Sequence, residues 1–539
     1  MSPLTLSRAP SSSLRLAIFV PAGPVPAWVA RLVGDCTGLP DVELVALLRD
    51  GIAMPEGDWA DRLDGLVFDR GSSPLRLVPL DAPAGVAEWS GTDANEAAGW
   101  LAGQGSDVLV DLRLAPFALA PGPDHHWTLM LAGRPAVDPL AGAAPVVDGE
   151  ESTEIRLEAV ADGAPVDASL GASCSFSIRR NRRRAIAKGM GMVRRALLRL
   201  ARGSAGEGSD ASASATAWVP AEAPAAAARF TTLLQRGVSR SALKAFHRDQ
   251  WGIALALGEG ICLDPARARL IYPPADRFWA DPMVWPAEGG GWWVFIEEVI
   301  YREGKGTLQA LRVHPDGDWE PPVPVMRRPW HLSYPFVFEW NGELWMVPES
   351  GANRTVELYR CIGLPDRWEK VQDIFTGIDL VDATLFAHEG RWWLLGNVTE
   401  PGADKHDELH AFHAETPLGP WQPHAANPVV ADARFARPAG PVFIHEGRLL
   451  RPAQVCVPEY GHALSLQCID RLTPDDYAEH TEGHIAPGWR PGIDCVHTLS
   501  HQPGLTAFDF LVRRPRFAPW SLPQSAPLGA AGNDEGTTK

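Results

Sequence analysis

Acidic residues that recur in similar surroundings are the first chemical feature of the sequence. Asp281 lies in the string FWADP, Asp382 lies in DATLF, and Glu349 follows an apolar run that begins at Leu344. Two carboxylates facing a bound sugar are what glycosidic chemistry needs, because one activates a nucleophile while the other protonates the leaving oxygen. These three acids are therefore candidate catalytic groups. The alternative is structural, since an aspartate ahead of a strand often caps a turn.

A second set of polar residues flanks the acidic strings, and its members are His331, Arg451, Gln454, Tyr460 and His497. Arginine suits phosphate or carboxylate, and the other side chains can bind hydroxyl groups, so we expect this set to hold a substrate. His497 is equally well interpreted as a packed, hydrogen-bonded histidine. The seven cysteines form no CxxC pair and Gly23 stands alone, so the sequence predicts no metal ligands and no cofactor.

The elements that must position these residues form a repeat after residue 275. A small or acidic residue is followed by an apolar strand, a turn and a strand rich in Trp or Leu, at intervals of about 50 residues. The turns include Asn341-Gly342, Glu389-Gly390 and Glu446-Gly447, which are typical of hairpins. This pattern predicts a five-bladed all-β propeller over 262–515. The first strand of each blade should line the channel, so Asp281, Tyr334, Asp382, Gly440 and Asp494 should converge near the axis.

The N-terminal part, 13–175, has a different pattern. Apolar strands at Leu14–Val20, Val42–Leu48 and Asp107–Leu112 alternate with a helix expected over Asp93–Gln104. Strands that alternate with helices predict a Rossmann-like α/β domain. The chain is therefore expected to be multidomain.

The two parts are joined by segments of biased composition. Residues 176–202 form an amphipathic stretch rich in arginine, and 203–228 form a linker rich in Gly, Ser and Ala. A connecting helix is expected within 229–261, and a disordered tail over 516–539. The stretch Arg179–Arg202 could lie on an anionic membrane surface, or pack as a basic helix against the acidic rest of the protein. The net charge of −17 argues against a nucleic-acid partner.

The acidic strings also resemble known families. FWADP and DATLF are similar to the five-bladed propeller of glycoside hydrolase family 43, which implies that Asp281 is the base and that Asp382 tunes the acid. The acid of that family belongs to an EGP triplet, and here the triplet reads Ala439-Gly440-Pro441. This difference favours glycosyl transfer over hydrolysis and leaves open whether the chain is an enzyme.

A more specific resemblance spans about residues 275–515. PWHLSYPFVF, MVPES, RPAQ (Arg451–Gln454) and His497-Thr498-Leu499 resemble the N-terminal domain of glucosamine inositolphosphorylceramide transferases. The N-terminal part weakly resembles a degenerate formyltransferase-like domain.

Together these features predict a carbohydrate-active protein. It would act through the propeller channel on a sugar, or a nucleotide- or lipid-linked sugar, in surface-glycan synthesis. The alternatives are a non-catalytic glycan-recognition module and a scaffolding protein. A cytoplasmic location is expected, with peripheral attachment to a membrane as the variant.

Overall fold

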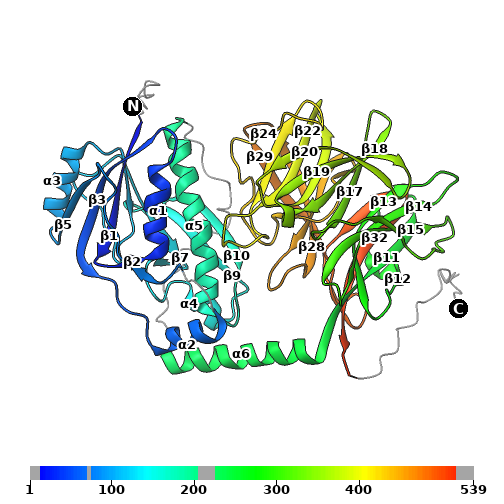
Figure 1. Cartoon of the computed structure of the whole chain (residues 1–539), viewed down its shortest axis with the longest axis horizontal. Coiled ribbons are helices and arrows are strands. Elements are labelled where there is room, and N and C mark those ends of the chain that lie inside the picture. Colours follow the sequence, from blue (N-terminus) through cyan, green and yellow to red (C-terminus); the bar gives the residue numbers. More distant parts are fainter. Residues whose placement is uncertain (1–12, 70–73, 204–224, 518–539) are drawn as a thin grey trace, which may run out of the picture.

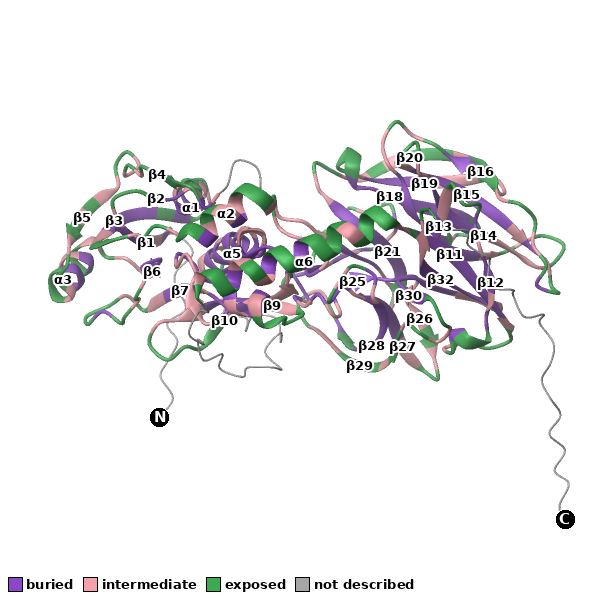
Figure 2. Ribbon diagram, turned by 90° about the horizontal axis from the view of Figure 1, so that it is seen from below, coloured by how far each residue is buried: buried purple, intermediate pink, exposed green. Residues whose placement is uncertain are grey.

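The computed structural model describes residues 13–69, 74–203 and 225–517, which form two domains (Figure 1). Most of the predicted linker and of the predicted tail lies outside these described residues. The domains are connected by helix α6 (Ala226–Phe246), whose surface is exposed along most of its length (Figure 2). No helix in the described part of the chain is both long and apolar enough to cross a membrane.

The N-terminal domain is built on a mixed sheet, as predicted for an α/β domain. In spatial order its strands are β10 (Pro165–Ala172), β9 (Ser152–Ala159), β7 (His125–Leu131), β6 (Val108–Asp111), β1 (Leu14–Ala22), β3 (Val42–Ala53) and β5 (Ala87–Gly91). The strands from β7 to β5 run parallel and β9 and β10 add an antiparallel hairpin. The short strands are β2 (Val25–Pro26), β4 (Leu77–Val78) and β8 (Arg134–Pro135).

Helices cover both faces of this sheet. They are α1 (Ala27–Thr37), α2 (Trp59–Phe68), α3 (Ala94–Gln104), α4 (Ala143–Asp148) and α5 (Ile178–Ala201). Leu16 and Ile18 of β1 pack against α1 and α5, whereas Ala17 and Phe19 pack against α3. Because side chains alternate along a strand, the apolar run of β1 supplies the core on both sides.

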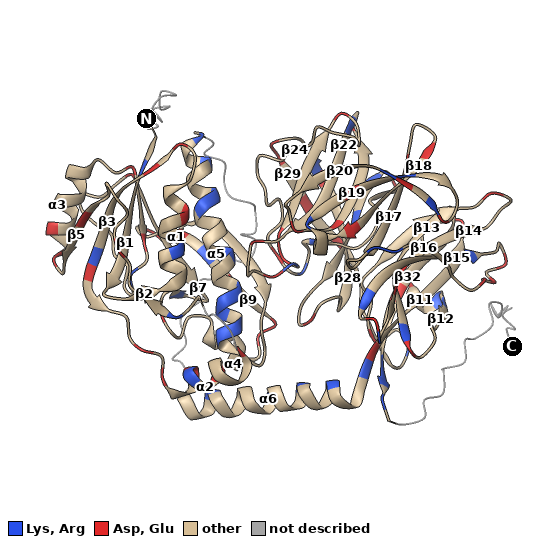
Figure 3. Cartoon of the chain, in the orientation of Figure 1, with Lys and Arg blue, Asp and Glu red and all other residues tan. Residues whose placement is uncertain are grey.

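Helix α5 confirms the predicted basic helix and lies between the two domains. Figure 3 shows the basic residues along this helix. Four of its cations pair with acids of the propeller loop 400–408: Arg184 with Asp404, Lys188 with Asp407, Arg194 with Glu400 and Arg195 with Glu408. Lys188 pairs with Asp407, and both side chains are 4% exposed. The helix thus packs with part of its basic surface against an acidic part of the protein. A membrane-surface role for Arg179–Arg202 stays a prediction, with Lys188 and Arg195 of this stretch already paired within the protein.

The glycines of α5 permit this close packing. A Cβ on Gly189 would meet Ile155 of the sheet at 2.6 Å, and a Cβ on Gly191 would meet Glu400 of the propeller at 3.1 Å. Glycine in a helix costs about 1 kcal/mol relative to alanine. In α5 this cost is offset by close packing, because the two glycines let the sheet approach one side of the helix and the propeller approach the other.

The C-terminal domain is a five-bladed propeller, as predicted, and four of its blades follow one another along the chain. Blade one contains β13 (Arg277–Pro286), β14 (Trp292–Ile300), β15 (Lys305–Val313) and β16 (Val323–Met326). Blade two contains β17 (Ser333–Trp340), β18 (Glu343–Ser350), β19 (Thr355–Gly363) and β20 (Arg367–Thr376). Blade three contains β21 (Leu380–His388), β22 (Arg391–Val398), β23 (Leu409–Ala414) and β24 (Gln422–Pro423). Blade four contains β25 (Arg437–Pro438), β26 (Phe443–His445), β27 (Arg448–Val455), β28 (Ala463–Leu472) and β29 (Tyr477–Ile485).

Blade five joins the two ends of the domain. Its strands are β30 (Ile493–Cys495), β31 (Leu499–Gln502), β32 (Gly504–Pro515), β11 (His247–Gly258) and β12 (Arg269–Ile271). β11 pairs with β32 in one unbroken register from His247↔Pro515 to Gly258↔Gly504. The propeller therefore begins at His247, and the predicted boundary at 262 is too late. Only the first part of the predicted connecting segment is helical.

Candidate functional site

The innermost strands of blades one to three carry the same backbone irregularity. Asp281, Tyr334 and Asp382 have φ values of 53°, 42° and 55°, and the strand register shifts at each of them. A non-glycine residue in this region costs on the order of 1–3 kcal/mol. Three such residues at equivalent positions indicate that the bulges are kept for what they position, because such strain concentrates at functional sites.

Asp281 is buried where blades one, two and five meet. Its Oδ2 accepts from the Tyr334 N–H at 3.0 Å, and its Oδ1 accepts from the Thr498 hydroxyl at 3.1 Å. His497 Nε2 lies 3.4 Å from Oδ1. Burial raises the pKa of Asp281 to about 7; His497 opposes this shift, whereas nearby carboxylates, Glu297 first, add to it. Asp281 therefore changes charge near neutral pH.

His497 is held by Asp509, a buried residue of β32. His497 Nδ1 lies 2.6 Å from Asp509 Oδ2, and the imidazole packs against Trp251 with ring centroids 4.1 Å apart. Asp509 Oδ1 also accepts the backbone N–H groups of His497 and Thr498, both at 2.9 Å. Burial lowers the pKa of His497, but the Asp509 carboxylate outweighs it and the pKa rises to about 8. At neutral pH a protonated imidazole thus faces Asp281.

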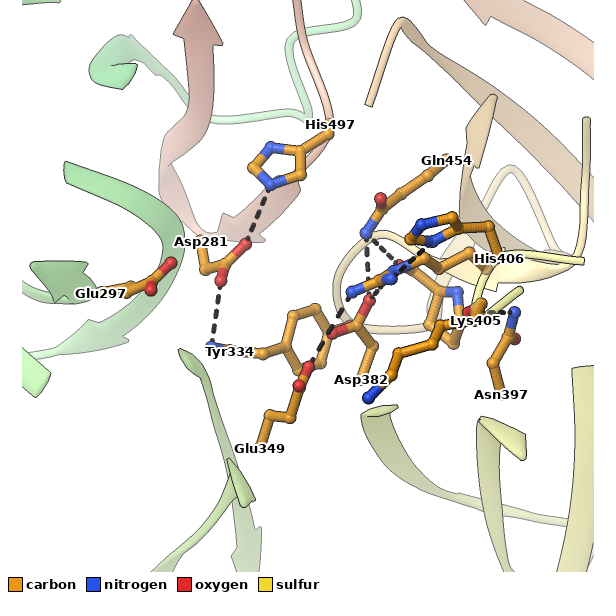
Figure 4. Close-up of polar contacts among 12 residues, drawn as sticks. Asp281, Glu297, Tyr334, Glu349, Asp382, Asn397, Lys405, His406, Gln454 and His497 are labelled. Carbon is orange, nitrogen blue, oxygen red and sulfur yellow. Dashed lines mark hydrogen bonds and ion pairs between the residues drawn. The ribbon is translucent and has the colours of Figure 1, made fainter. Parts of the chain in front are cut away.

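Asp382 belongs to a second group across the channel (Figure 4). Its Oδ2 accepts from Arg437 Nε at 2.6 Å and from Gln454 Nε2 at 3.1 Å. Arg437 Nη1 lies 2.7 Å from His406 Nδ1. Burial and then Arg437 lower the pKa of His406 to about 4, so its neutral ring can accept this hydrogen bond. Asp382 is therefore fixed in place by the hydrogen bonds that Arg437 and Gln454 donate.

Glu349 faces this second group from β18. Its Oε2 lies 3.9 Å from Arg437 Nη2, and its side chain is 15% exposed. Burial raises the pKa of Glu349 well above its usual range, and Asp382 and Asp281 add to the rise while Arg437 opposes it. Asp382 is thus close enough to Asp281 and Glu349 to raise the pKa of each. The predicted convergence of these three acids is found in the structure.

Tyr334 lies between the two acidic groups. Its hydroxyl is 2.8 Å from Thr384 Oγ1 and accepts the Gly440 N–H at 2.8 Å, so one side chain ties blade two to blades three and four. The ring is fully buried. Tyr334 therefore fixes the spacing across the axis.

The other expected substrate-binding residues take different places. Gln454 is buried beside Asp382, as described above, and Tyr460 lies nearby with 39% of its surface exposed and its ring 4.9 Å from that of His406. His331 is at the edge between blades one and two, where its Nε2 lies 3.1 Å from Glu297 Oε1.

Arg451 is not brought to this group. Its guanidinium is 1% exposed and pairs with Glu479 at 2.6 Å inside blade four, with a further bond to the Phe435 carbonyl. It stabilises the blade and is not placed to contact a substrate. Asp494 also departs from expectation, because its side chain lies 4.0 Å from Arg513 and the bulge of blade five presents His497 and Thr498 instead.

Three contributors were missed by sequence reasoning. Glu297, and not its neighbour Glu298, faces Asp281 (Figure 4). Glu297 on β14 is equivalent to Glu349 on β18, since Glu297 lies two residues after Phe295 and Glu349 lies two residues after Val347, and Phe295 and Val347 hold the same place in the strand pairing of their blades. Aligning the second strand of blade one with that of blade two would have identified Glu297 from the sequence. His406 lies in a loop outside the repeat, and Asp509 lies in an apolar strand, so neither carried a recognisable pattern.

Among the described residues two groups of donors have a spacing that could hold a metal ion, and one of them, Asp281 with His497 and Asp509, lies in the channel. Ligand atoms of Asp281, His497 and Asp509 all lie within 4.8 Å of one another. However, Asp509 already pairs with His497 and accepts three backbone N–H groups, one of them from Asp281. The arrangement is therefore satisfied by contacts within the protein, and it acts as a charge-paired triad.

The propeller is the part of the chain that is similar to known proteins. Residues 270–485 match the family model "Glucosamine inositolphosphorylceramide transferase 1, N-terminal". The proteins named glucosamine inositolphosphorylceramide transferase 1 from Arabidopsis thaliana and Oryza sativa subsp. japonica are 35% and 34% identical to this chain over 207 and 212 residues. These matches cover 38% and 39% of this chain but 27% and 28% of the relatives. The chain thus spans little more than a quarter of the curated relatives it matches.

The family match includes Asp281, Glu349 and Asp382 and ends before His497 and Asp509. Among solved structures, a family 117 glycoside hydrolase from Zobellia galactanivorans is 12% identical with a TM-score of 0.32, covering 49% of this chain and 90% of its own. The GH43_1 enzyme from Xanthomonas citri is 15% identical with a TM-score of 0.31, covering 47% and 92%. The five-bladed architecture itself follows from the strand pairing described above.

Proposed function

We propose that this chain transfers a sugar, from a nucleotide-, lipid- or glycosidically linked donor, to a hydroxyl acceptor in surface-glycan synthesis. The observation that carries the proposal is the pair Asp281 and Glu349, one buried and one half-buried acid of raised pKa in one channel. The transferase name of the curated relatives supports the same class of reaction.

The two acids suit opposite halves of a transfer step. Asp281 accepts the proton of the acceptor hydroxyl, whose oxygen forms the new bond to the anomeric carbon. The bond from that carbon to the leaving oxygen breaks, and protonated Glu349 supplies a proton to that oxygen. Glu349 thereby fills the acid role that Ala439 cannot. Burial keeps the pKa of Glu349 high, and Asp382, which is held by Arg437, adds to the rise.

Dependence on the leaving group tests this assignment. Thermal-shift screening with nucleotide sugars and nitrophenyl glycosides identifies a donor, because a ligand that binds only the folded state raises the melting temperature. We expect Glu349→Gln to lower turnover of alkyl glycosides by about 100-fold or more. Phosphate- and nitrophenyl-linked donors should be much less affected, since their leaving groups need no proton. Asp281→Asn should impair every donor class.

The matched control is Glu343→Gln, which changes an exposed glutamate on the same strand as Glu349. Equal turnover of alkyl glycosides by Glu349→Gln and wild type would overturn the acid role. Binding without any turnover would instead favour a glycan-recognition module, for which the hydrogen bonds already made by both Asp281 oxygens argue. No binding by any sugar would contradict both functions.

A further inference from the structure

A second hollow lies on the other face of blade one, away from the channel residues. It is a cavity of about 850 Å³ bounded by strands of blade one, by the connector 272–274 from blade five and by the loop 319–322. Glu298 lines it, whereas the adjacent Glu297 faces the channel, because successive side chains of β14 point to opposite faces.

The polar groups of this cavity are unusual for their position. Elsewhere the same face of blade one is apolar, and its Ile296 and Leu311 pack against Ile253 of blade five. At the cavity these residue types are replaced by polar ones that are more than nine-tenths buried, namely Glu298, Thr307 and Gln309. Burying polar groups costs free energy unless they are hydrogen-bonded. These three side chains therefore need hydrogen-bond partners.

The hydrogen bonds within the protein only partly satisfy these groups. Glu298 Oε2 accepts from Arg277 Nη1 at 3.1 Å and from Trp279 Nε1 at 3.0 Å, which fixes the carboxylate in the cavity wall. Thr307 and Gln309 are joined only by long contacts, from Gln309 Nε2 to Thr307 Oγ1 and from Thr307 Oγ1 to the Glu298 carbonyl, both 3.4 Å. Such distances lie at the outer limit of hydrogen bonding. Donor and acceptor capacity therefore remains for a ligand.

The opposite wall is aromatic and apolar. Trp319 lines the cavity with its ring edge-to-face to Trp279, at 6.1 Å between centroids, and prolines and Met326 complete the wall. A ring face opposite a few fixed polar groups suits a pyranose, whose C–H face packs on aromatic rings while its hydroxyls both donate and accept. A phosphate or carboxylate ligand would meet the Glu298 carboxylate. The two arginines that line the cavity are already paired with acids, Arg277 with Glu298 and Asp276, and Arg327 with Glu303. We propose that this cavity binds an uncharged sugar residue of a glycan, independently of the channel.

A printed array of neutral oligosaccharides tests this site on the full-length protein. The near-isosteric variants Thr307→Val and Gln309→Leu remove hydrogen-bonding groups without opening space. Loss of one to two hydrogen bonds is expected to weaken binding of the best array glycan about tenfold, measured by titration calorimetry. Trp319→Ala should weaken the same glycan. Unchanged melting temperatures establish that the variants with weakened binding are folded.

Two comparisons make the outcome decisive. Gln372→Leu, on the outer strand of blade two, is the matched control and should bind as wild type. Asp281→Asn separates this cavity from the channel, since a glycan held at the cavity keeps its affinity in that variant. The proposal is overturned if the array shows no bound glycan, or if every bound glycan is lost in Asp281→Asn and kept in both polar cavity variants.

Discussion

Asp281 illustrates how the fold changes the chemistry of a single side chain. In an unfolded chain its carboxyl group would titrate near 3.8, and in the folded protein its pKa is about 7. Its neighbour His497 shifts in the same direction, from 6.5 to about 8, because Asp509 stabilises the protonated ring. Both groups thus bind a proton more tightly in the folded state than in the unfolded state.

The stability that these two groups contribute should therefore fall as pH rises. The contribution of Asp281 is complete below about pH 4 and is lost as pH rises towards 7, and that of His497 is complete below 6.5 and is lost through about 8. Each pKa unit is worth about 1.4 kcal/mol. We predict that raising the pH from 5 to 8 lowers the melting temperature of wild type relative to that of Asp281→Asn, because the variant lacks the titrating carboxyl group.

The control for this prediction is Asp366→Asn, at an exposed turn of blade two. It should reproduce the pH profile of wild type. A profile of Asp281→Asn that runs parallel to wild type would show that Asp281 keeps an ordinary pKa in the folded protein.

At the scale of elements, helix α5 connects the N-terminal domain to the channel. Arg184 Nη1 lies 2.9 Å from Asp404 Oδ2, and Asp404 Oδ1 lies 3.2 Å from His406 Nε2. His406 in turn contacts Arg437, which holds Asp382. The loop 400–408 thus pairs with α5 on one side and contacts the channel residues on the other. The N-terminal domain contributes to the site by positioning this loop.

The buried pair Lys188–Asp407 is the point at which this contact is most sensitive. Lys188→Met should destabilise the protein by about 3–5 kcal/mol, because it leaves the Asp407 charge buried without a partner. Adding Asp407→Asn should restore much of the loss. Thermal unfolding gives the stability, and hydrogen exchange over 400–408 reports whether the loop loosens.

Lys244→Met on the exposed part of α6 is the matched control and should change stability little. Loss of stability that the second substitution fails to restore would indicate that the Lys188 stem, and not its charge, holds the contact.

The limits of sequence reasoning are also clearest at this scale. Hairpin turns such as Asn341-Gly342, in which both residues adopt positive φ, made the blades predictable because their signal is local. β11 was placed in the predicted connecting segment and not in the propeller, because Trp251–Leu257 is apolar throughout and its strand partner lies some 260 residues away. Arg451 resembled a free cation because Glu479, its partner, lies on another strand of blade four.

At the scale of the whole molecule, the propeller is closed by strands from both of its ends. Pairing of β11 with β32 means that the first and last strands of the domain protect each other's edges. The convergence of Asp281 with His497 and Asp509 depends on this closure, since blade five supplies the last two. The site is therefore a property of the closed ring.

Two fragments test the corrected boundary. A fragment of residues 241–517 retains β11 and should unfold in one cooperative thermal transition. A fragment of 262–517 lacks β11, exposes the edge of β32 and should lack that transition, as followed by calorimetry. Both fragments lack α5, so they differ only in the segment in question, and cooperative unfolding of the shorter one would contradict the account of closure.

Acids that are distant in sequence share one electrostatic environment in the channel of this propeller. Carboxyl ¹³C NMR titration of Asp281 and Glu349, in wild type and in Asp382→Asn, measures this most directly. We predict that both groups titrate above the usual range in wild type, and that both pKa values fall when the Asp382 charge is removed. Titration of both groups near pH 4, unchanged in Asp382→Asn, would contradict the account.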